Sequence, residues 1–307
     1  MKAAVIREYG TPIEIADVPK PALLADSVLI EVHAASVNPV DGFVQAGYLR
    51  EMMPITFPFT MGFDVSGVVV EAGDQVSNFK KGDEVYSRPN GMQAGTIAEY
   101  AVIKAEEIAI KSANISHQEA ASIPLVGLTA WQALVTKGNI QKGQKVLIHA
   151  GSGGVGTLAI QMAKYLGAQV ATTTSATNIE LVKSLGADLV IDYKTQKFEE
   201  ALSDYDLVID MMGGETLERS FKVLKKGGRL VSIKGEDSNG LAEQYGVHFE
   251  SFFMWPSGEM LSQLAKLISQ GAIKPVIDRT FSMDQVQDAY AYLQTGRAKG
   301  KVVIQVV

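Results

Sequence analysis

The chain has 307 residues, enough for about two domains, and its 47% hydrophobic and 20% charged residues are typical of a globular protein. A net charge of −6 without any run of Lys or Arg argues against nucleic acid or an anionic membrane as the main partner. Cysteine is absent, which excludes disulfides, thiolate nucleophiles and cysteine-ligated metal sites; with no signal-peptide pattern and no bilayer-spanning apolar run, we expect a cytoplasmic protein.

Short β-rich segments separated by turn signals fill about the first 113 residues. The clearest are residues 27–37, 65–76, 82–87 and 95–103, with Gly or Asp at their edges. This texture predicts a compact, barrel-like β module.

A helical pattern follows the β-rich segments. Ser116 and Glu119 have capping-box spacing, Pro124 interrupts the helix, and the pattern resumes over 128–137. From Lys145 the pattern changes to alternating strands and helices. We expect buried strands at 145–150, 168–174, 187–193, 205–213 and 228–234, and helices at 155–167, 179–186 and 215–228. Continuous apolar strands separated by helices predict an α/β fold, a doubly wound parallel sheet covered on both faces.

A glycine-rich loop joins the first of these strands to the first helix. Gly151, Gly153 and Gly156 form the pattern G-x-G-x-x-G between a predicted strand and a predicted helix. Such a loop lets the backbone approach a pyrophosphate at the helix N-terminus. The alternative is a tight turn that holds no ligand.

The second predicted strand has no acidic residue at its end. NAD-binding folds of this kind usually place Asp or Glu there, to accept from the ribose 2′-hydroxyl. Here the strand runs into Thr174 and Ser175, and the first acid after the loop is Glu180. A carboxylate would repel a 2′-phosphate and hydroxyls would not, so the sequence favours NADPH over NADH.

Thr177 and Glu180 also have capping-box spacing, which predicts Thr177 as a helix cap. No Arg or Lys lies at 175–178, so a positive charge for the phosphate must come from further away, for example from Lys194 or Arg297. The four histidines show no ligand spacing, and we expect no metal site.

Along nearly its whole length the chain resembles the medium-chain dehydrogenase/reductase superfamily, specifically the zinc-free quinone oxidoreductase and alkenal (enone) reductase branch. The resemblance is carried by residues 35–41, 62–69, 82–87, 119–134, 149–168, 183–193 and 271–304. It implies a GroES-like β-barrel catalytic domain over 1–121, completed by 260–307, which forms one wall of the active-site cleft. A Rossmann dinucleotide-binding domain would then span 122–259.

The zinc-dependent members of the superfamily carry a catalytic Cys, a Gly-His-Glu segment and a four-Cys lobe. This chain has Asn38, Gly-Phe-Asp at 62–64 and no Cys. Hydride addition to an ordinary carbonyl needs a Lewis acid, whereas quinones and α,β-unsaturated carbonyls spread the developing charge by conjugation. We therefore expect NADPH-dependent, zinc-independent reduction of a small quinone or enone. The alternatives are reduction of another activated alkene such as an enoyl thioester, reduction of a carbonyl, or non-catalytic NADPH binding.

Three residues are candidates for catalysis. Asn38 matches the family's active-site Asn; alternatively it supports a turn before Pro39. Tyr48 could donate to an oxyanion, although many relatives carry the Tyr one position later, and core packing is the alternative. Asp41 is either a buried orienting group or, as we favour, a helix-start residue.

The resemblance also assigns the cofactor site. It places Thr129 at the nicotinamide, Ser152, Gly154 and Val155 at the pyrophosphate, and Ser175, Asn178 and Tyr193 at the adenosine phosphate; Met212, Ile233 and Gly235 follow strand ends at the crevice. Many relatives have Lys in place of Asn178, which keeps NADH open as the cofactor. The apolar run 249–255 is either an edge strand that pairs two subunits or a core strand, and we expect a homodimer.

Overall fold

The computed structural model describes residues 1–90 and 95–307 and divides into two compact units. Unit 1 comprises Met1–Leu128, Trp255–Gly271 and Pro275–Val307, and unit 2 comprises Thr129–Met254 and Ala272–Lys274. The divisions thus lie at 128/129 and 254/255 rather than at 121/122 and 259/260.

Contacts of the flanking residues explain both differences. Helix α3 (Pro124–Trp131) begins in unit 1, where the Leu125 N–H donates to Asp64 Oδ1 at 2.7 Å. At the other boundary Gly258 is pressed against the backbone of unit 1, since a Cβ there would overlap the carbonyl oxygen of Ile108. Unit 1 therefore extends past residue 121 to Leu128, and it resumes at Trp255, before residue 260.

Unit 1 contains two β-sheets, of order β2-β1-β4 and β15-β16-β3-β5-β6-β8, with β7 also paired to β3. Their strands are β1 (Lys2–Ile6), β2 (Glu14–Asp17), β3 (Ser27–Val37), β4 (Phe59–Thr60), β5 (Asp64–Ala72), β6 (Glu84–Ser87), β7 (Tyr100–Lys104), β8 (Ile108–Ile110), β15 (Ile277–Ser282) and β16 (Lys301–Gln305). Buried side chains that alternate along β3, namely Val28, Ile30 and Val32, pack with Val65 and Val85 in the core of the larger sheet. This is the β module expected from the first third of the sequence.

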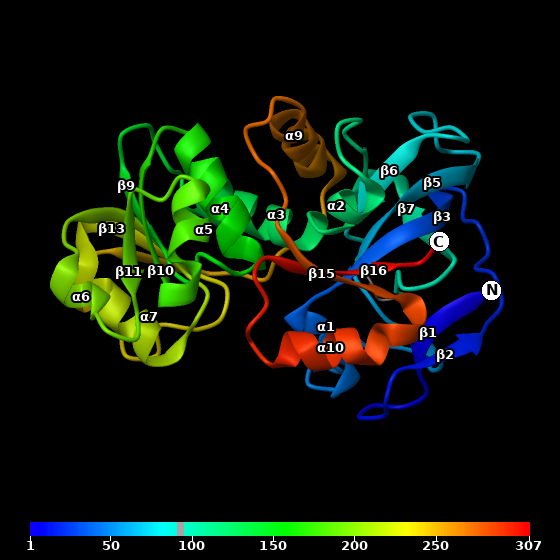
Figure 1. Ribbon diagram of the computed structural model, residues 1–307, viewed down its shortest axis with the longest axis horizontal. Helices are drawn as coiled ribbons and strands as arrows, with labels where there is room; N and C mark the ends of the chain where they lie inside the picture. Colours follow the sequence, from blue (N-terminus) through cyan, green and yellow to red (C-terminus); the bar gives the residue numbers. More distant parts are fainter. Residues whose placement is uncertain (91–94) are drawn as a thin grey trace. The chain divides into compact units, whose positions relative to one another are not determined.

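The length of β3 brings the end of the chain to the start of the first helix. The first half of β3 pairs with β7, and its second half pairs with β16, where Val302 faces Val37. Figure 1 shows β16, near the C-terminus, beside β3. Lys301 is therefore placed next to Asn38, although the two residues are 263 positions apart in sequence.

Besides the start of α3, the described part of unit 1 contains the helices α1 (Pro39–Gln45), α2 (His117–Ala121), α9 (Gly258–Ser269) and α10 (Val286–Gln294). The predicted capping box is confirmed at α2, where Ser116 Oγ accepts from the Glu119 N–H at 3.2 Å. Strand β15 and helix α10 come from the C-terminal segment of the chain.

Unit 2 is a six-stranded parallel sheet of order β11-β10-β9-β12-β13-β14. The strands are β9 (Lys145–Ile148), β10 (Gln169–Thr174), β11 (Leu189–Asp192), β12 (Tyr205–Asp210), β13 (Leu224–Ser232) and β14 (His248–Ser251). The chain leaves β9 toward β10 on one side and places β12 on the other, so the order reverses at β9. Ligands of such folds bind where the strand order reverses, which is where the glycine loop lies.

Helices cover both faces of this sheet, α4 and α5 on one and α6 and α7 on the other (Figure 1). They are α4 (Gly154–Tyr165), α5 (Ile179–Ser184), α6 (Phe198–Ala201), α7 (Gly214–Ser220) and α8 (Leu241–Tyr245), with a π-helix, η2 (Gln132–Lys137), after α3. The doubly wound α/β fold is therefore confirmed.

Two segments, residues 215–228 and 249–255, differ in part from the expected elements. The helix predicted over 215–228 is wrong in its second half: α7 ends at Ser220, and β13 begins at Leu224, because Leu224 pairs with Tyr205 and Gly227 has a φ of +71° that a helix does not allow. The run 249–255 does form an edge strand, but only Ser251 and the residues before it belong to β14. Pairing of that edge between subunits stays a prediction.

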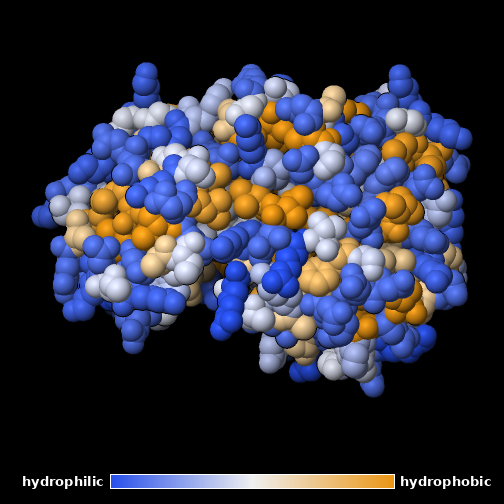
Figure 2. All heavy atoms as spheres, viewed as in Figure 1, coloured by the Kyte–Doolittle hydropathy of each residue, from blue (hydrophilic) through white to orange (hydrophobic). Residues whose placement is uncertain are grey.

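The face of the molecule in Figure 2 is mostly hydrophilic, and its apolar areas are interrupted by polar side chains. Within the described residues, no helix combines the length and the apolar character that crossing a bilayer requires.

Candidate functional site

The three glycines of the loop between β9 and α4 differ in what surrounds them. A Cβ on Gly156 would overlap the carbonyl oxygen of Ala150 and lie 2.7 Å from Gly151 Cα, and a Cβ on Gly151 would overlap the Thr172 hydroxyl. A Cβ on Gly153 would meet only the Ala150 oxygen, at 3.3 Å. Gly151 and Gly156 are therefore required by packing, whereas the space around a Cβ at Gly153 is nearly open.

A cluster of hydroxyls and one amide lies at the end of β10. Thr174 donates to Ser152 Oγ at 2.9 Å, and Asn178 Nδ2 donates to Ser152 Oγ at 3.1 Å and to Ser175 Oγ at 3.4 Å. Asn178 Oδ1 is buried and has no hydrogen-bond partner among residues 1–90 and 95–307. The structure thus joins Ser152, predicted at the pyrophosphate, to Thr174, Ser175 and Asn178, and none of these four side chains carries a charge.

The predicted role of Thr177, which lies beside this cluster, is wrong. Thr177 is not a helix cap: a 3-10 turn (Ala176–Asn178) precedes α5, so the helix begins at Ile179 and Thr177 Oγ1 instead contacts Ser175 Oγ at 3.1 Å. Glu180 is exposed and pairs with Lys183 at 3.4 Å. The Glu180 carboxylate therefore pairs within α5, while Asp192 on the neighbouring strand β11 lies opposite Thr174.

Most other predicted cofactor residues also lie around the carboxyl ends of the strands of unit 2. Tyr193 is 59% exposed, and its N–H donates to the Thr174 carbonyl at 3.2 Å. Gly154 and Val155 open helix α4, and Thr129 is buried in α3. Arg297, by contrast, is an exposed residue of unit 1, on the turn after α10, and its role in binding the phosphate stays a prediction.

One residue that organises the strand ends was missed by the sequence reasoning. Asp210, fully buried at the end of β12, accepts from the Met212 N–H at 3.0 Å and from the Ser232 hydroxyl at 2.8 Å. The Ile233 N–H donates to the Asp210 carbonyl, and the Gly235 N–H donates to Ser232 Oγ. The sequence signal that could have identified Asp210 is an acidic residue at the end of a continuous apolar strand.

Unit 1 contains a buried ionic cluster at the junction of β3, β5 and β16. Lys301 Nζ donates to the Val37 carbonyl at 3.0 Å, to Asn38 Oδ1, and to Asp64 Oδ2 at 3.4 Å. Asp64 Oδ2 also accepts from Asn38 Nδ2 at 2.8 Å and from the Ser36 hydroxyl at 2.7 Å. The amide of Asn38 is thus held at both ends, and its side chain is 1% exposed.

Asp41 combines the two roles that the sequence left open. It lies in the first turn of α1, where its Oδ2 accepts from the Asn38 N–H at 2.7 Å, and it is fully buried, with the Tyr290 hydroxyl donating at 3.0 Å. Burial raises the pKa of Asp41 to about 7 despite these hydrogen bonds and the charge of Lys301. Its Oδ1 has no hydrogen-bond partner in the part of the chain that is described.

Burial also lowers the pKa of Lys301, while the carboxylates of Asp64 and Asp41 act in the opposite direction. The Lys301 ammonium can make three hydrogen bonds, and the structure gives it three oxygen acceptors. This arrangement suits the charged form.

Tyr48 does not pack in the core, which removes that alternative. It lies in the turn after α1 and is 78% exposed, with the Phe43 ring 6.4 Å away between centroids. Its side chain is therefore accessible from solvent.

The side chains at the positions of the zinc-dependent pattern do not fit a catalytic zinc ion. Phe63 is a fully buried core residue, and the oxygens of Asn38 and Asp64 already accept hydrogen bonds from the Lys301 ammonium. Zinc prefers Cys, His and carboxylate ligands in an open tetrahedral site. Among the described residues, no group of three or more His, Asp or Glu could hold a metal ion.

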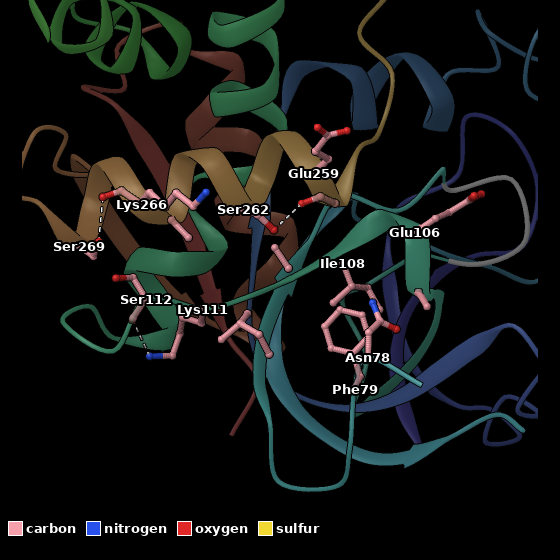
Figure 3. A pocket seen from close by; sticks show the side chains of 15 residues that line it. Asn78, Phe79, Glu106, Ile108, Lys111, Ser112, Glu259, Ser262, Lys266 and Ser269 are labelled. Atoms are coloured by element: carbon pink, nitrogen blue, oxygen red, sulfur yellow. Dashed lines mark hydrogen bonds between the residues drawn. The ribbon is translucent and has the colours of Figure 1, made fainter. Parts of the chain in front are cut away.

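A separate groove of about 580 Å³ lies in unit 1 between β8 and α9 (Figure 3). Three of its polar side chains are hydrogen-bonded within the protein: Lys111 Nζ donates to the Ile115 carbonyl at 2.7 Å, and the Ser262 and Ser269 hydroxyls donate to carbonyls of α9. None of the predicted site residues lines it, and the candidate site therefore remains the two clusters described above.

Comparison with known proteins agrees with the family resemblance seen in the sequence. Residues 25–113 match the alcohol dehydrogenase GroES-like domain, 126–212 the C-terminal domain of alanine dehydrogenase/PNT, and 185–304 a family described as zinc-binding dehydrogenase. The 2-methylene-furan-3-one reductase of Solanum lycopersicum is 39% identical over 99% of this chain and 79% of its own length. The NADPH-dependent alkenal/one oxidoreductase of Arabidopsis thaliana, a chloroplastic protein, is 37% identical over 99% of this chain and 79% of its own length. The structure of the quinone oxidoreductase from Coxiella burnetii superposes with a TM-score of 0.92, at 35% identity, covering 100% of this chain and 99% of that one.

The chain belongs to the medium-chain dehydrogenase/reductase superfamily, and within it to the branch of quinone oxidoreductases and alkenal reductases. It is an oxidoreductase with a Rossmann-like unit and a GroES-like unit.

Proposed function

We propose that the chain catalyses NADPH-dependent reduction of quinones or α,β-unsaturated carbonyls. The observation that carries this proposal is the glycine loop, with open space at Gly153, next to a cluster of uncharged hydroxyl and amide groups at the end of β10. The names of the relatives support the same substrate classes: a 2-methylene-furan-3-one reductase, an NADPH-dependent alkenal/one oxidoreductase and a quinone oxidoreductase.

The choice of NADPH over NADH rests on Ser152, Thr174, Ser175 and Asn178. Hydroxyl and amide groups can donate to a 2′-phosphate, whereas a carboxylate at this place would repel it. Since Asn178 carries no positive charge, we expect a modest preference for NADPH over NADH rather than an absolute one.

Cytoplasmic location of the protein also remains a prediction.

A bound dihydronicotinamide supplies a hydride, and the residues of the chain must then stabilise an enolate or phenolate oxyanion. Two groups of unit 1 are suited to this task. The Tyr48 hydroxyl is exposed and can donate a hydrogen bond or a proton, and Asn38 Nδ2 has a second hydrogen besides the one given to Asp64. A delocalised oxyanion needs only such donors, because conjugation has already spread the charge.

The proposal is tested by following nucleotide oxidation at 340 nm with a panel of 1,4-benzoquinones, 2-alkenals, enones, an enoyl thioester and simple ketones. We expect turnover with the quinones or enones, slower turnover or none with the ketones, and a lower KM for NADPH than for NADH. Turnover of simple ketones alone, or NADPH binding without oxidation of it by any acceptor, would contradict the proposal.

A further inference from the structure

Asn38 can act as a donor to the substrate only if its amide is fixed in one orientation. A carboxamide has a carbonyl oxygen and an NH₂ group of nearly equal size, and it can rotate to exchange them. In the structure the oxygen faces the Lys301 ammonium, and one hydrogen of Nδ2 faces the Asp64 carboxylate.

The two charges determine this orientation. If the amide were rotated by a half turn, its NH₂ group would face an ammonium and its oxygen would face a carboxylate, so two charge-assisted hydrogen bonds would become two repulsions. Lys301 and Asp64 are 5% and 0% exposed, so water does not screen these interactions.

Both charged groups are themselves held by several elements. Asp64 accepts at Oδ1 from the Leu125 N–H of α3 and at Oδ2 from Ser36 at the end of β3. Lys301 opens β16 and also donates to the Val37 carbonyl. Because a carboxamide is planar, holding the Asn38 oxygen and one Nδ2 hydrogen also fixes the direction of the second Nδ2 hydrogen.

We propose that Lys301, together with Asp64, is a positioning residue that fixes the Asn38 carboxamide so that the second Nδ2 hydrogen is the donor offered to the substrate. This inference rests on the proposed function, since it assigns a role within the same site. It concerns a residue from the last strand of the chain that does not itself need to touch the substrate.

The test is a double-mutant cycle of Lys301→Met and Asn38→Ala, with kcat measured at saturating NADPH and Kd for NADPH measured by fluorescence titration. Lys301→Met should lower kcat by about 10- to 100-fold, the effect of a lost or misdirected oxyanion donor, and leave Kd for NADPH unchanged. In the Asn38→Ala background the same substitution should have no further effect on kcat, because the group on which it acts is gone. Equal losses of kcat in both backgrounds would overturn the proposal.

Two further proteins serve as controls. Lys299→Met removes an exposed lysine two residues away and should leave kcat unchanged. Asp64→Asn with Lys301→Met removes both buried charges together, so it avoids leaving one of them unpaired if Lys301→Met alone does not fold. This double variant should show the same loss of kcat as Lys301→Met, and full activity in it would overturn the proposal.

A readout without substrate or nucleotide completes the test. In the wild-type protein the Asn38 side-chain amide should give two resolved ¹H–¹⁵N signals that exchange slowly with water, and the Lys301→Met protein should lose this protection. Unchanged protection would contradict a positioning role. If the wild-type protein turns over none of the acceptors, the proposed function fails and this inference with it. If wild type is active and Lys301→Met is equally active, only the inference fails.

Discussion

Substituting Gly153 by Ala separates nucleotide binding from folding at the glycine loop. Gly153 has a φ of −81° and a ψ of 176°, which alanine adopts without strain, and its Cβ would meet only the Ala150 oxygen, at 3.3 Å. We therefore expect the free energy of unfolding to change by less than about 1 kcal/mol. The added methyl group would, however, occupy the space in which we expect the pyrophosphate.

The expected loss of affinity follows from the hydrogen bonds that the methyl group would displace. A hydrogen bond to a charged group contributes about 1.5–3 kcal/mol, so losing one weakens NADPH binding by about 10- to 100-fold. Kd is measured by fluorescence titration and stability by calorimetry. Gly156→Ala is the comparison, because its Cβ would overlap the Ala150 oxygen and should destabilise the fold itself. A stable Gly153→Ala protein that binds NADPH as tightly as wild type would refute the assignment of this loop to the dinucleotide.

Three other predictions concern charge and assembly. Asn178→Lys adds a cation beside the hydroxyl cluster and should tighten NADPH binding by about tenfold without changing Kd for NADH; equal changes for both would place the 2′-phosphate elsewhere. The folded protein retains the Asp41 proton up to a pH of about 7, while the unfolded chain releases it near 3.8, so the free energy of unfolding should fall as the pH rises through this window. Urea denaturation at several pH values should show a fall of up to about 1.4 kcal/mol per pH unit that Asp41→Asn flattens, and an equal slope in the variant would exclude Asp41 as its source. Pairing of two β14 edges predicts a dimer by light scattering at micromolar concentration, and a monomer would contradict it.

The sequence predicted unit 2 well because its signals are local. Each apolar strand is followed by a helix within a few residues, and the glycine pattern falls between a strand and a helix, so periodicity and spacing were sufficient. The errors came where a local pattern competed with another contact. Thr177 had capping-box spacing, yet a 3-10 turn moved the helix start to Ile179, and strand pairing of Leu224 ended the predicted helix early.

The ionic cluster of unit 1 could not be predicted in this way. Lys301 lies 237 positions after Asp64, and the two meet only because the second half of β3 pairs with β16. Both residues lie in segments that carry the family resemblance, but no spacing rule predicts that they meet. Burial was equally hidden: Asp41 and Tyr48 are seven positions apart on one short segment, yet one is fully buried and the other is 78% exposed.

Turnover after removal of divalent metal ions shows most directly whether the reduction needs a Lewis acid. The protein is dialysed against a chelator, and NADPH oxidation is then followed with the best quinone or enone of the panel. We predict an unchanged kcat, because a conjugated acceptor and hydrogen-bond donors replace the Lewis acid. Loss of turnover after dialysis, with recovery on adding zinc, would contradict zinc-independent reduction of the acceptor.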